Sequence, residues 1–254
     1  MNYRKQHYVS SATTVIVAGA IKEKEALKKI EKIFSNISKD KKTKKLSVKE
    51  SQKKPEIKIF YKDTDQTHLV IALRTFPIND KRMPVMRVLS AILGQGMSSR
   101  LFSKMRDQLG ICYYIKAYHD ASTDHGHIAV TAGVDNKRVD IGIKNILIEL
   151  KKMTEELVGD KELKKVKDYI SGTTMLELET SDAQADYVGY QEILKREIKT
   201  PDEILHDVNQ VTTEDIRKLA REIFINKNLN MAIIGPYKDK KRFDKLVTFD
   251  ILNK

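Results

Sequence analysis

The chain has 254 residues, of which 41% are hydrophobic, so it can bury the core of one large domain or two modest ones. Much of its net charge of +12 lies in one lysine-rich segment, and its single cysteine, Cys112, excludes an intramolecular disulfide framework and a cysteine-based zinc site. No apolar run is long enough to span a membrane, and one cysteine fits a reducing compartment, so we expect a cytoplasmic protein without a membrane span.

The N-terminal residues 1–37 predict a buried strand followed by a basic helix. The apolar part of MNYRKQHYVSSATTVIVAGAI is short and β-branched and runs directly into a charged helical pattern. A signal peptide is therefore disfavoured, and the stretch TTVIVAGAI is expected to pair as a strand within its own domain or with a neighbouring chain. A homodimer formed through residues 1–37 is one outcome of that expectation.

Residues 38–54 are predicted to form a solvated, lysine-rich linker. The stretch 38–55 carries eight lysines and two acidic residues, with low hydrophobicity and no periodicity. A nucleic-acid site needs basic residues on a folded face with aromatic residues between them for base stacking. Because no such interleaving occurs, a basic nucleic-acid-associated protein is only the third hypothesis for this chain.

Residues 55–254 predict one complete α+β domain, a layered sheet covered by helices. Asp80 is expected to cap a helix over 81–93, and the sequence TTED (212–215) is a capping signal for another helix. Alternating and periodic patterns predict the remaining elements. Strands are predicted at 56–61, 67–74, 112–119, 126–133 and in NMAII, and helices at 98–109, 137–156, 160–178, 182–195, 201–209 and 213–223.

An internal repeat supports a two-domain parent. TTVIVAGAIKEKEALKKIEKIF (13–34) and LNMAIIGPYKDKKRFDKLVTF (229–249) each place a glycine and a basic helical segment after an apolar strand. Gly19 and Gly235 are 216 positions apart, but only 18 residues precede Gly19. We therefore interpret residues 1–37 as the C-terminal remnant of a first domain, although chance similarity of two strand–glycine–helix units remains an alternative.

The stretch GQGMSSRLFSKMRDQLGICYYIKAY (94–118) is the strongest candidate site. Gly96 permits a tight turn, Ser98 or the serine after it can cap the next helix, and Gly110 is placed to end that helix. The reversal brings Arg106 and Tyr113 toward the same space, where a guanidinium and a phenol could bind a peptide carbonyl or its oxyanion. The alternative is that Arg106 only complements the helix dipole while Tyr113 is half-buried.

The sequence LGQGMSSRLFSKMRDQLGICYYI resembles the second-domain motif of the insulinase/pitrilysin family of zinc metallopeptidases, which includes the mitochondrial processing peptidases. The resemblance continues through DHGHIAVTAGVD and TPDEILHDVNQVTTEDIRKLAREIF and covers about 55–237. It implies that Arg106 and Tyr113 are the catalytic and substrate-binding pair, with Gly96 and Ser98 also contacting substrate. Gln95, Cys112 and Tyr114 depart from the family pattern and put the substrate preference in doubt.

The resemblance also implies zinc in a first domain, held by an H-x-x-E-H motif that does not occur in this chain. Only His125 and His127 could share a strand face as metal ligands, and an exposed strand end explains them more simply. We therefore expect no metal site and no cofactor here, a peptide substrate, and a zinc-binding half or subunit as partner. The chain alone should be inactive, and a non-catalytic scaffold or binding subunit of the same fold is the second hypothesis.

Overall fold

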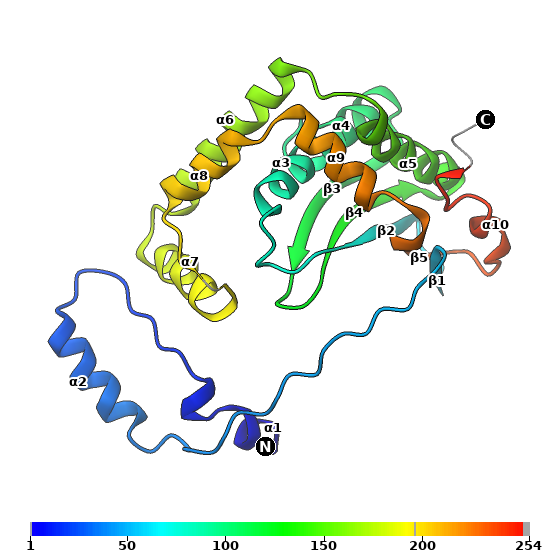
Figure 1. Ribbon diagram of the computed structural model, residues 1–254. Helices are drawn as coiled ribbons and strands as arrows, with labels where there is room; N and C mark the ends of the chain where they lie inside the picture. Colours follow the sequence, from blue (N-terminus) through cyan, green and yellow to red (C-terminus); the bar gives the residue numbers. More distant parts are fainter. Residues whose placement is uncertain (1, 196, 251–254) are drawn as a thin grey trace. The chain divides into compact units, whose positions relative to one another are not determined.

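The computed structural model describes residues 2–195 and 197–250, which fall into two compact units (Figure 1). Unit 1 comprises Met1–Val48 and Gly172–Pro201, and unit 2 comprises Lys49–Ser171 and Asp202–Lys254. The helices assigned to unit 1 are α1 (Asn2–His7), α2 (Glu23–Phe34) and α7 (Ser181–Leu194), together with the end of α6 (Asp160–Glu177).

The strand predicted in TTVIVAGAI is wrong. Residues 13–18 have no regular secondary structure, and the side chains of Val15 and Val17 are 41% and 47% exposed. The one strand-like contact of this region is an isolated parallel bridge between Val9 and Ser38. An extended segment becomes a strand only when a neighbouring strand accepts its backbone hydrogen bonds, and the described part of unit 1 holds no such strand.

Unit 2 is built on a five-stranded sheet in the order β1-β5-β2-β4-β3. β1 runs parallel to β5, and the other neighbours are antiparallel. The strands confirm the predicted ones within two residues at each end, and their bounds are β1 (Glu56–Tyr61), β2 (Gln66–Thr75), β3 (Cys112–Ala121), β4 (Gly126–Asp135) and β5 (Leu229–Gly235). The predicted α+β class is therefore confirmed.

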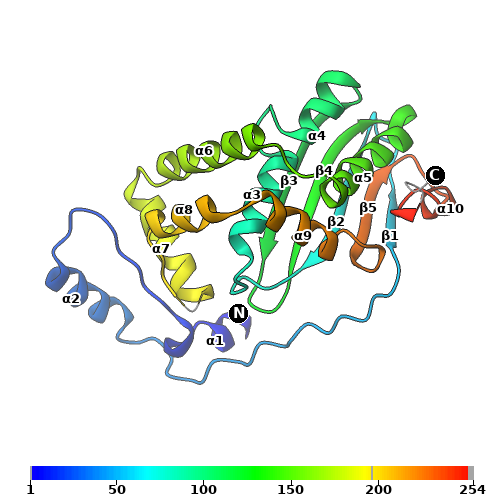
Figure 2. The same ribbon diagram turned by 45° about the horizontal axis from the view of Figure 1, so that its top comes forward.

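One side of the sheet is covered by helices (Figure 2). α3 (Met83–Gly94) packs on β3, α5 (Val139–Glu155) on β4, and α9 (Thr213–Ile223) on β2. The shorter helices α8 (Pro201–Gln210) and α10 (Lys241–Asp244) complete the unit. The predicted capping box is confirmed, because the Thr212 side chain accepts from the Asp215 amide and the Asp215 carboxylate accepts from the Thr212 amide. The Thr212 hydroxyl also donates to the Asp215 carboxylate, and this bond, together with the one from the Thr212 amide, lowers the pKa of Asp215.

Two predicted helix starts differ from the structure. α3 begins at Met83 rather than at residue 81, because the Asp80 carboxylate accepts hydrogen bonds from the backbone and guanidinium of Arg82 instead of capping the helix. The same bonds lower the pKa of Asp80. The helix predicted over 98–109 is a short α4 (Arg100–Phe102) that widens into the π-helical turn η2 (Ser103–Gln108).

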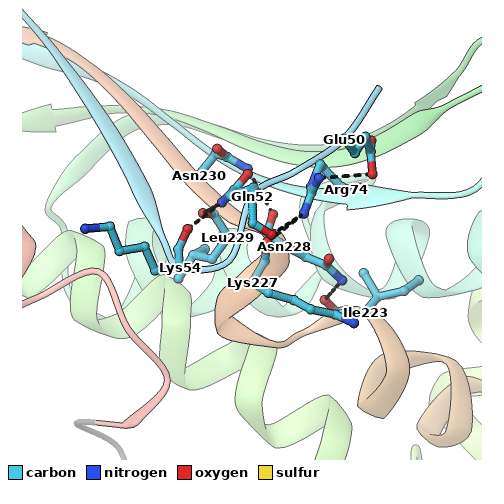
Figure 3. Close-up of polar contacts among 9 residues, drawn as sticks. All are labelled: Glu50, Gln52, Lys54, Arg74, Ile223, Lys227, Asn228, Leu229 and Asn230. Carbon is cyan, nitrogen blue, oxygen red and sulfur yellow. Dashed lines mark hydrogen bonds and ion pairs between the residues drawn. The ribbon is translucent and has the colours of Figure 1, made fainter. Parts of the chain in front are cut away.

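The end of the predicted lysine-rich linker is attached to the sheet (Figure 3). Arg74, near the end of β2, donates to the Glu50 carboxylate at 3.0 Å and to the Lys227 carbonyl at 2.8 Å. Gln52 donates from Nε2 to the Leu229 carbonyl at 2.9 Å, at the start of β5. Residues 50–52, which we call the strap, therefore belong to unit 2 rather than to a fully solvated segment.

Candidate functional site

We call residues 94–118 the site hairpin. It begins where α3 ends against β3. An ideal Cβ on Gly94 would lie 2.1 Å from the backbone nitrogen of Ala117, so only glycine permits this approach of helix to strand. Two residues later Gly96 has a φ of +77°, in the region that favours glycine, and the chain turns into α4. These two glycines place the Met-Ser-Ser-Arg-Leu-Phe sequence beside the start of β3.

The hairpin closes at Gly110, whose φ of +55° confirms the predicted helix stop. The guanidinium of Arg138 donates to the Leu109 carbonyl at 3.2 Å and to the Gly110 carbonyl at 2.5 Å. It thereby satisfies carbonyls that the end of a helix leaves without partners. The sequence analysis missed Arg138. Once a helix end is predicted at Gly110, a basic residue from another element is a candidate donor to its free carbonyls.

The structure brings Arg106 and Tyr113 together. Nη1 of Arg106 donates to the Tyr113 carbonyl oxygen, and the guanidinium carbon lies 5.8 Å from the centre of the Tyr113 ring. Both side chains are exposed, Tyr113 by 73%. The pairing of β3 with β4 shifts register between Cys112 and Tyr114, so Tyr113 is the extra residue of a bulge, a feature that redirects a side chain. A guanidinium fork and a phenol hydroxyl therefore face solvent at one end of β3.

Cys112 beside this pair is a packing residue. Its side chain is buried, and burial raises the pKa of the Cys112 thiol, while the nearby Arg106 charge acts in the opposite direction with a smaller effect. A buried thiol with a raised pKa is a poor nucleophile. Cys112 therefore fills the core beneath the bulge, and the chemistry available here is hydrogen bonding from Arg106 and Tyr113.

Ser98 borders a hollow that the Arg106–Tyr113 pair does not line. The hollow is polar, has a volume of about 370 Å³, and its lining also includes Arg100, Lys104, Glu149 and Lys152. The serine that follows Ser98 donates from its hydroxyl to the Gly96 carbonyl at 2.8 Å, so it closes the glycine turn and does not cap the helix by its side chain. The structure therefore brings Arg106 and Tyr113 together but does not place Ser98 in the same hollow with them.

Arg100 is the charged residue of the motif that the structure buries most firmly. Its guanidinium makes two bonds to the Glu162 carboxylate, at 2.9 and 2.7 Å, and these bonds raise the pKa of Arg100. The pair joins α4 to α6 within unit 2. Arg100 is therefore engaged in holding the motif in place, a role that the sequence did not reveal.

Zinc does not fit the described residues of this chain. His125 bonds Asp124 through Nδ1 at 2.9 Å, and no group of three or more His, Cys, Asp or Glu side chains able to hold a metal occurs in residues 2–195 and 197–250. Tetrahedral zinc needs at least three protein ligands. The zinc implied by the family resemblance is therefore not assigned to any described residue.

Among the described residues, no helix is long and apolar enough to cross a membrane.

The α+β fold, with its glycine turn and π-helical hairpin, defines a metallopeptidase-like domain, and its described residues include no group of zinc ligands. The chain belongs to the peptidase M16 inactive domain family, whose model matches residues 1–170. This finding confirms the resemblance to the insulinase/pitrilysin peptidases.

Relatives of the chain are named as zinc proteases. The uncharacterized zinc protease YmxG of Bacillus subtilis is 29% identical over 92% of the chain and 56% of the relative, and a zinc protease of Streptomyces coelicolor is 28% identical over 94% and 53%. The chain thus spans about half the length of the curated relatives it matches.

Solved structures share the fold at low sequence identity. A protease from Helicobacter pylori has a TM-score of 0.78 and 17% identity, with 86% of this chain and 54% of that chain covered. A peptidase M16 inactive domain from Pseudomonas fluorescens gives 0.77 and 15%, with 87% and 53% covered. A chain of Complex III2 from Candida albicans gives 0.73 and 16%, with 90% and 57% covered.

Proposed function

We propose that the chain is the substrate-binding part of an insulinase-family metalloendopeptidase, in which Arg106 and Tyr113 bind the peptide at the scissile bond. The observation that carries the proposal is the exposed pairing of a guanidinium with a phenol, on the hairpin that matches the family motif. Both groups donate hydrogen bonds, and both could follow a carbonyl oxygen as it becomes an oxyanion. Gly96 and Ser98, in the turn that precedes α4, would also contact the peptide.

The activated water would come from a zinc-binding half, supplied by another part of the protein or by a partner subunit. In this proposal residues 1–37 are the end of a first peptidase-like domain, residues 38–54 the connection, and residues 55–254 the second domain. The exposed apolar side chains around Val15 and Val17 are where the zinc-binding half, or a second copy of the chain, would pair. A cytoplasmic location rests on the single cysteine alone.

The test is reconstitution. The chain would be mixed with the part of the Bacillus subtilis relative that it does not match, association would be followed by light scattering, and cleavage of a quenched fluorescent peptide would be measured with and without chelator. Tyr113→Phe or Arg106→Ala should lower turnover by about 10²- to 10³-fold, as expected for one lost oxyanion donor. Tyr61→Phe and Arg217→Ala, on β1 and α9, are the matched controls.

Two results would refute the proposal. Unchanged turnover in both Tyr113→Phe and Arg106→Ala would show that the pair takes no part in catalysis. Chelator-sensitive cleavage by the chain alone would show that the zinc ligands lie within it.

A scaffold or binding subunit of the same fold is the second candidate, favoured by the fold likeness to a chain of Complex III2. A stable, peptide-binding complex with no cleavage would favour that candidate.

A further inference from the structure

The side of the sheet away from α3, α5 and α9 carries several exposed, large apolar side chains. Side chains alternate along each strand, so the residues between the core residues point to this second side, which we call the open face. On it Phe60 is 64% exposed, Tyr118 41% and Ile234 40%. An antiparallel sheet with one solvated face normally carries polar residues there. The open face therefore offers a ligand exposed apolar side chains in addition to its polar ones.

One row across the open face combines small, mostly apolar residues with a lysine at each edge of the sheet. Strand register places Lys58 beside Ala232, Ala232 beside Val70, Val70 beside Thr131, and Thr131 beside Lys116. Both lysines are exposed, and neither forms an ion pair within the described residues. The row is a shallow apolar track with a positive charge at each end.

The row next to this track carries larger side chains, and it leads to the Arg106–Tyr113 pair. It begins with Phe60 and Ile234 and ends with His68 and Tyr114, whose rings stack at 6.1 Å and whose Nδ1 and hydroxyl oxygen are 3.1 Å apart. Tyr114 follows Tyr113 in the chain. A ligand lying along the track would therefore be adjacent to the proposed peptide site.

The spacing of the two lysines sets the length of the ligand. Four gaps between neighbouring strands, each of about 4.8 Å, put the backbones of Lys58 and Lys116 roughly 19 Å apart. An extended peptide advances about 3.3 Å per residue, so about six residues span this distance.

We propose that the open face binds an extended peptide segment in which two acidic residues about six positions apart flank apolar ones. The acidic residues pair with Lys58 and Lys116, and the apolar residues lie over Ala232 and Val70. This inference rests on the proposed peptide-binding function and adds a substrate class to it. Opposite charges across such a surface provide selectivity more than affinity, so the expected signature is discrimination between peptides.

The experiment measures fluorescence anisotropy of labelled, unstructured twelve-residue peptides titrated with the full chain at 0.15 M salt. The peptide with two glutamates six apart should bind about tenfold more tightly than the same peptide with two lysines, and more tightly than one whose glutamates are adjacent. The double variant Lys58→Glu/Lys116→Glu should abolish or invert this preference. The charge-matched control Lys144→Glu/Lys161→Glu, on α5 and α6, should retain it.

Equal binding of the acidic and basic peptides would overturn the inference, as would an equal loss of preference in the control. A change of oligomeric state caused by Lys58→Glu/Lys116→Glu, seen by light scattering, would also overturn it by making the open face a contact between copies. Failure of this inference can be distinguished from failure of the proposed function. The preference is measured without any zinc-binding half and without cleavage, so loss of turnover in the reconstituted protein leaves it unaffected.

Discussion

Replacing Gly94 with alanine should destabilise unit 2 by separating the end of α3 from β3. The added Cβ would lie 2.1 Å from the Ala117 backbone nitrogen and 2.5 Å from its Cβ, whereas ordinary contacts begin near 3.4 Å. The helix end or the strand must therefore move by about 1.3 Å, the difference between 3.4 and 2.1 Å. Ile92 and Leu93 at this end of α3 are fully buried, so the movement disturbs a packed core.

The expected loss is about 2–2.5 kcal/mol in the free energy of unfolding. Overpacking typically costs about 1–3 kcal/mol, and the clash falls near the upper limit because backbone atoms cannot turn aside as a flexible side chain can. The better helix propensity of alanine offsets about 0.5–1 kcal/mol of this cost. Urea titration followed by circular dichroism would measure the loss, and hydrogen exchange of residues 112–121 would show whether β3 is the strand that loosens.

Gly172→Ala is the matched control. Gly172 lies within α6 with no atom within 4 Å of its would-be Cβ, so the same chemical change should stabilise the chain by up to about 1 kcal/mol. A loss below about 1 kcal/mol for Gly94→Ala, or unchanged exchange in β3, would refute the argument that the close approach requires glycine.

Two further predictions concern pH and the site hairpin. Burial lowers the pKa of His119 from 6.5 to about 4. As the pH falls from 6.5 to 4, the unfolded chain takes up a proton that the folded chain does not, so the free energy of unfolding should decrease. The decrease should be about 1–2 kcal/mol, because the ring is partly exposed and solvent screens its charge. Urea titrations should show that His119→Gln removes this pH dependence, whereas the control His206→Gln retains it. Arg138→Ala should cost about 1–2 kcal/mol and speed amide exchange at residues 109–113, because the Leu109 and Gly110 carbonyls lose a charged donor; unchanged exchange there would contradict this role.

Local patterns predicted much of unit 2. Alternating residues predicted all five strands, and the order threonine-threonine-glutamate-aspartate predicted the capping box of α9. Gly110 was predictable as a helix stop, because glycine adopts positive φ without strain. Each of these signals lies within a few residues in the chain, where no distant partner can override it.

The wrong predictions depended on interactions or local geometry that the residue pattern does not specify. TTVIVAGAI has the composition of a strand, but composition cannot show whether a neighbouring strand is present to pair with it. Asp80 is a residue type that often caps helices, but its carboxylate accepts a hydrogen bond from the Arg82 guanidinium instead. The π-helical turn η2 leaves the apolar spacing of Leu101 and Met105 unchanged, so periodicity alone cannot distinguish it from an α-helix.

The candidate site was predictable in part for the same reason. Arg106 and Tyr113 are seven residues apart across a glycine stop, so local geometry is enough to bring them together. Arg138 reaches the hairpin from beyond β4, and Glu162 reaches Arg100 from α6, so neither contact has a signature in the motif itself. The residues that support a site come from separate elements, and their identification requires the fold.

The two proposals assign different tasks to opposite parts of one surface. Along β2, His68 points to the open face near Tyr114, and Arg74, six residues and about 20 Å further, is occupied by the strap (Figure 3). A peptide on the open face would therefore lie between the strap and the Arg106–Tyr113 pair. The face would select side chains by charge and apolar contact, while the pair would bind a backbone carbonyl that every peptide carries. Under the two proposals selectivity and chemistry would be separable by mutation, because altering Lys58 and Lys116 would change which peptide binds, whereas altering Tyr113 would lower turnover in the reconstituted protein.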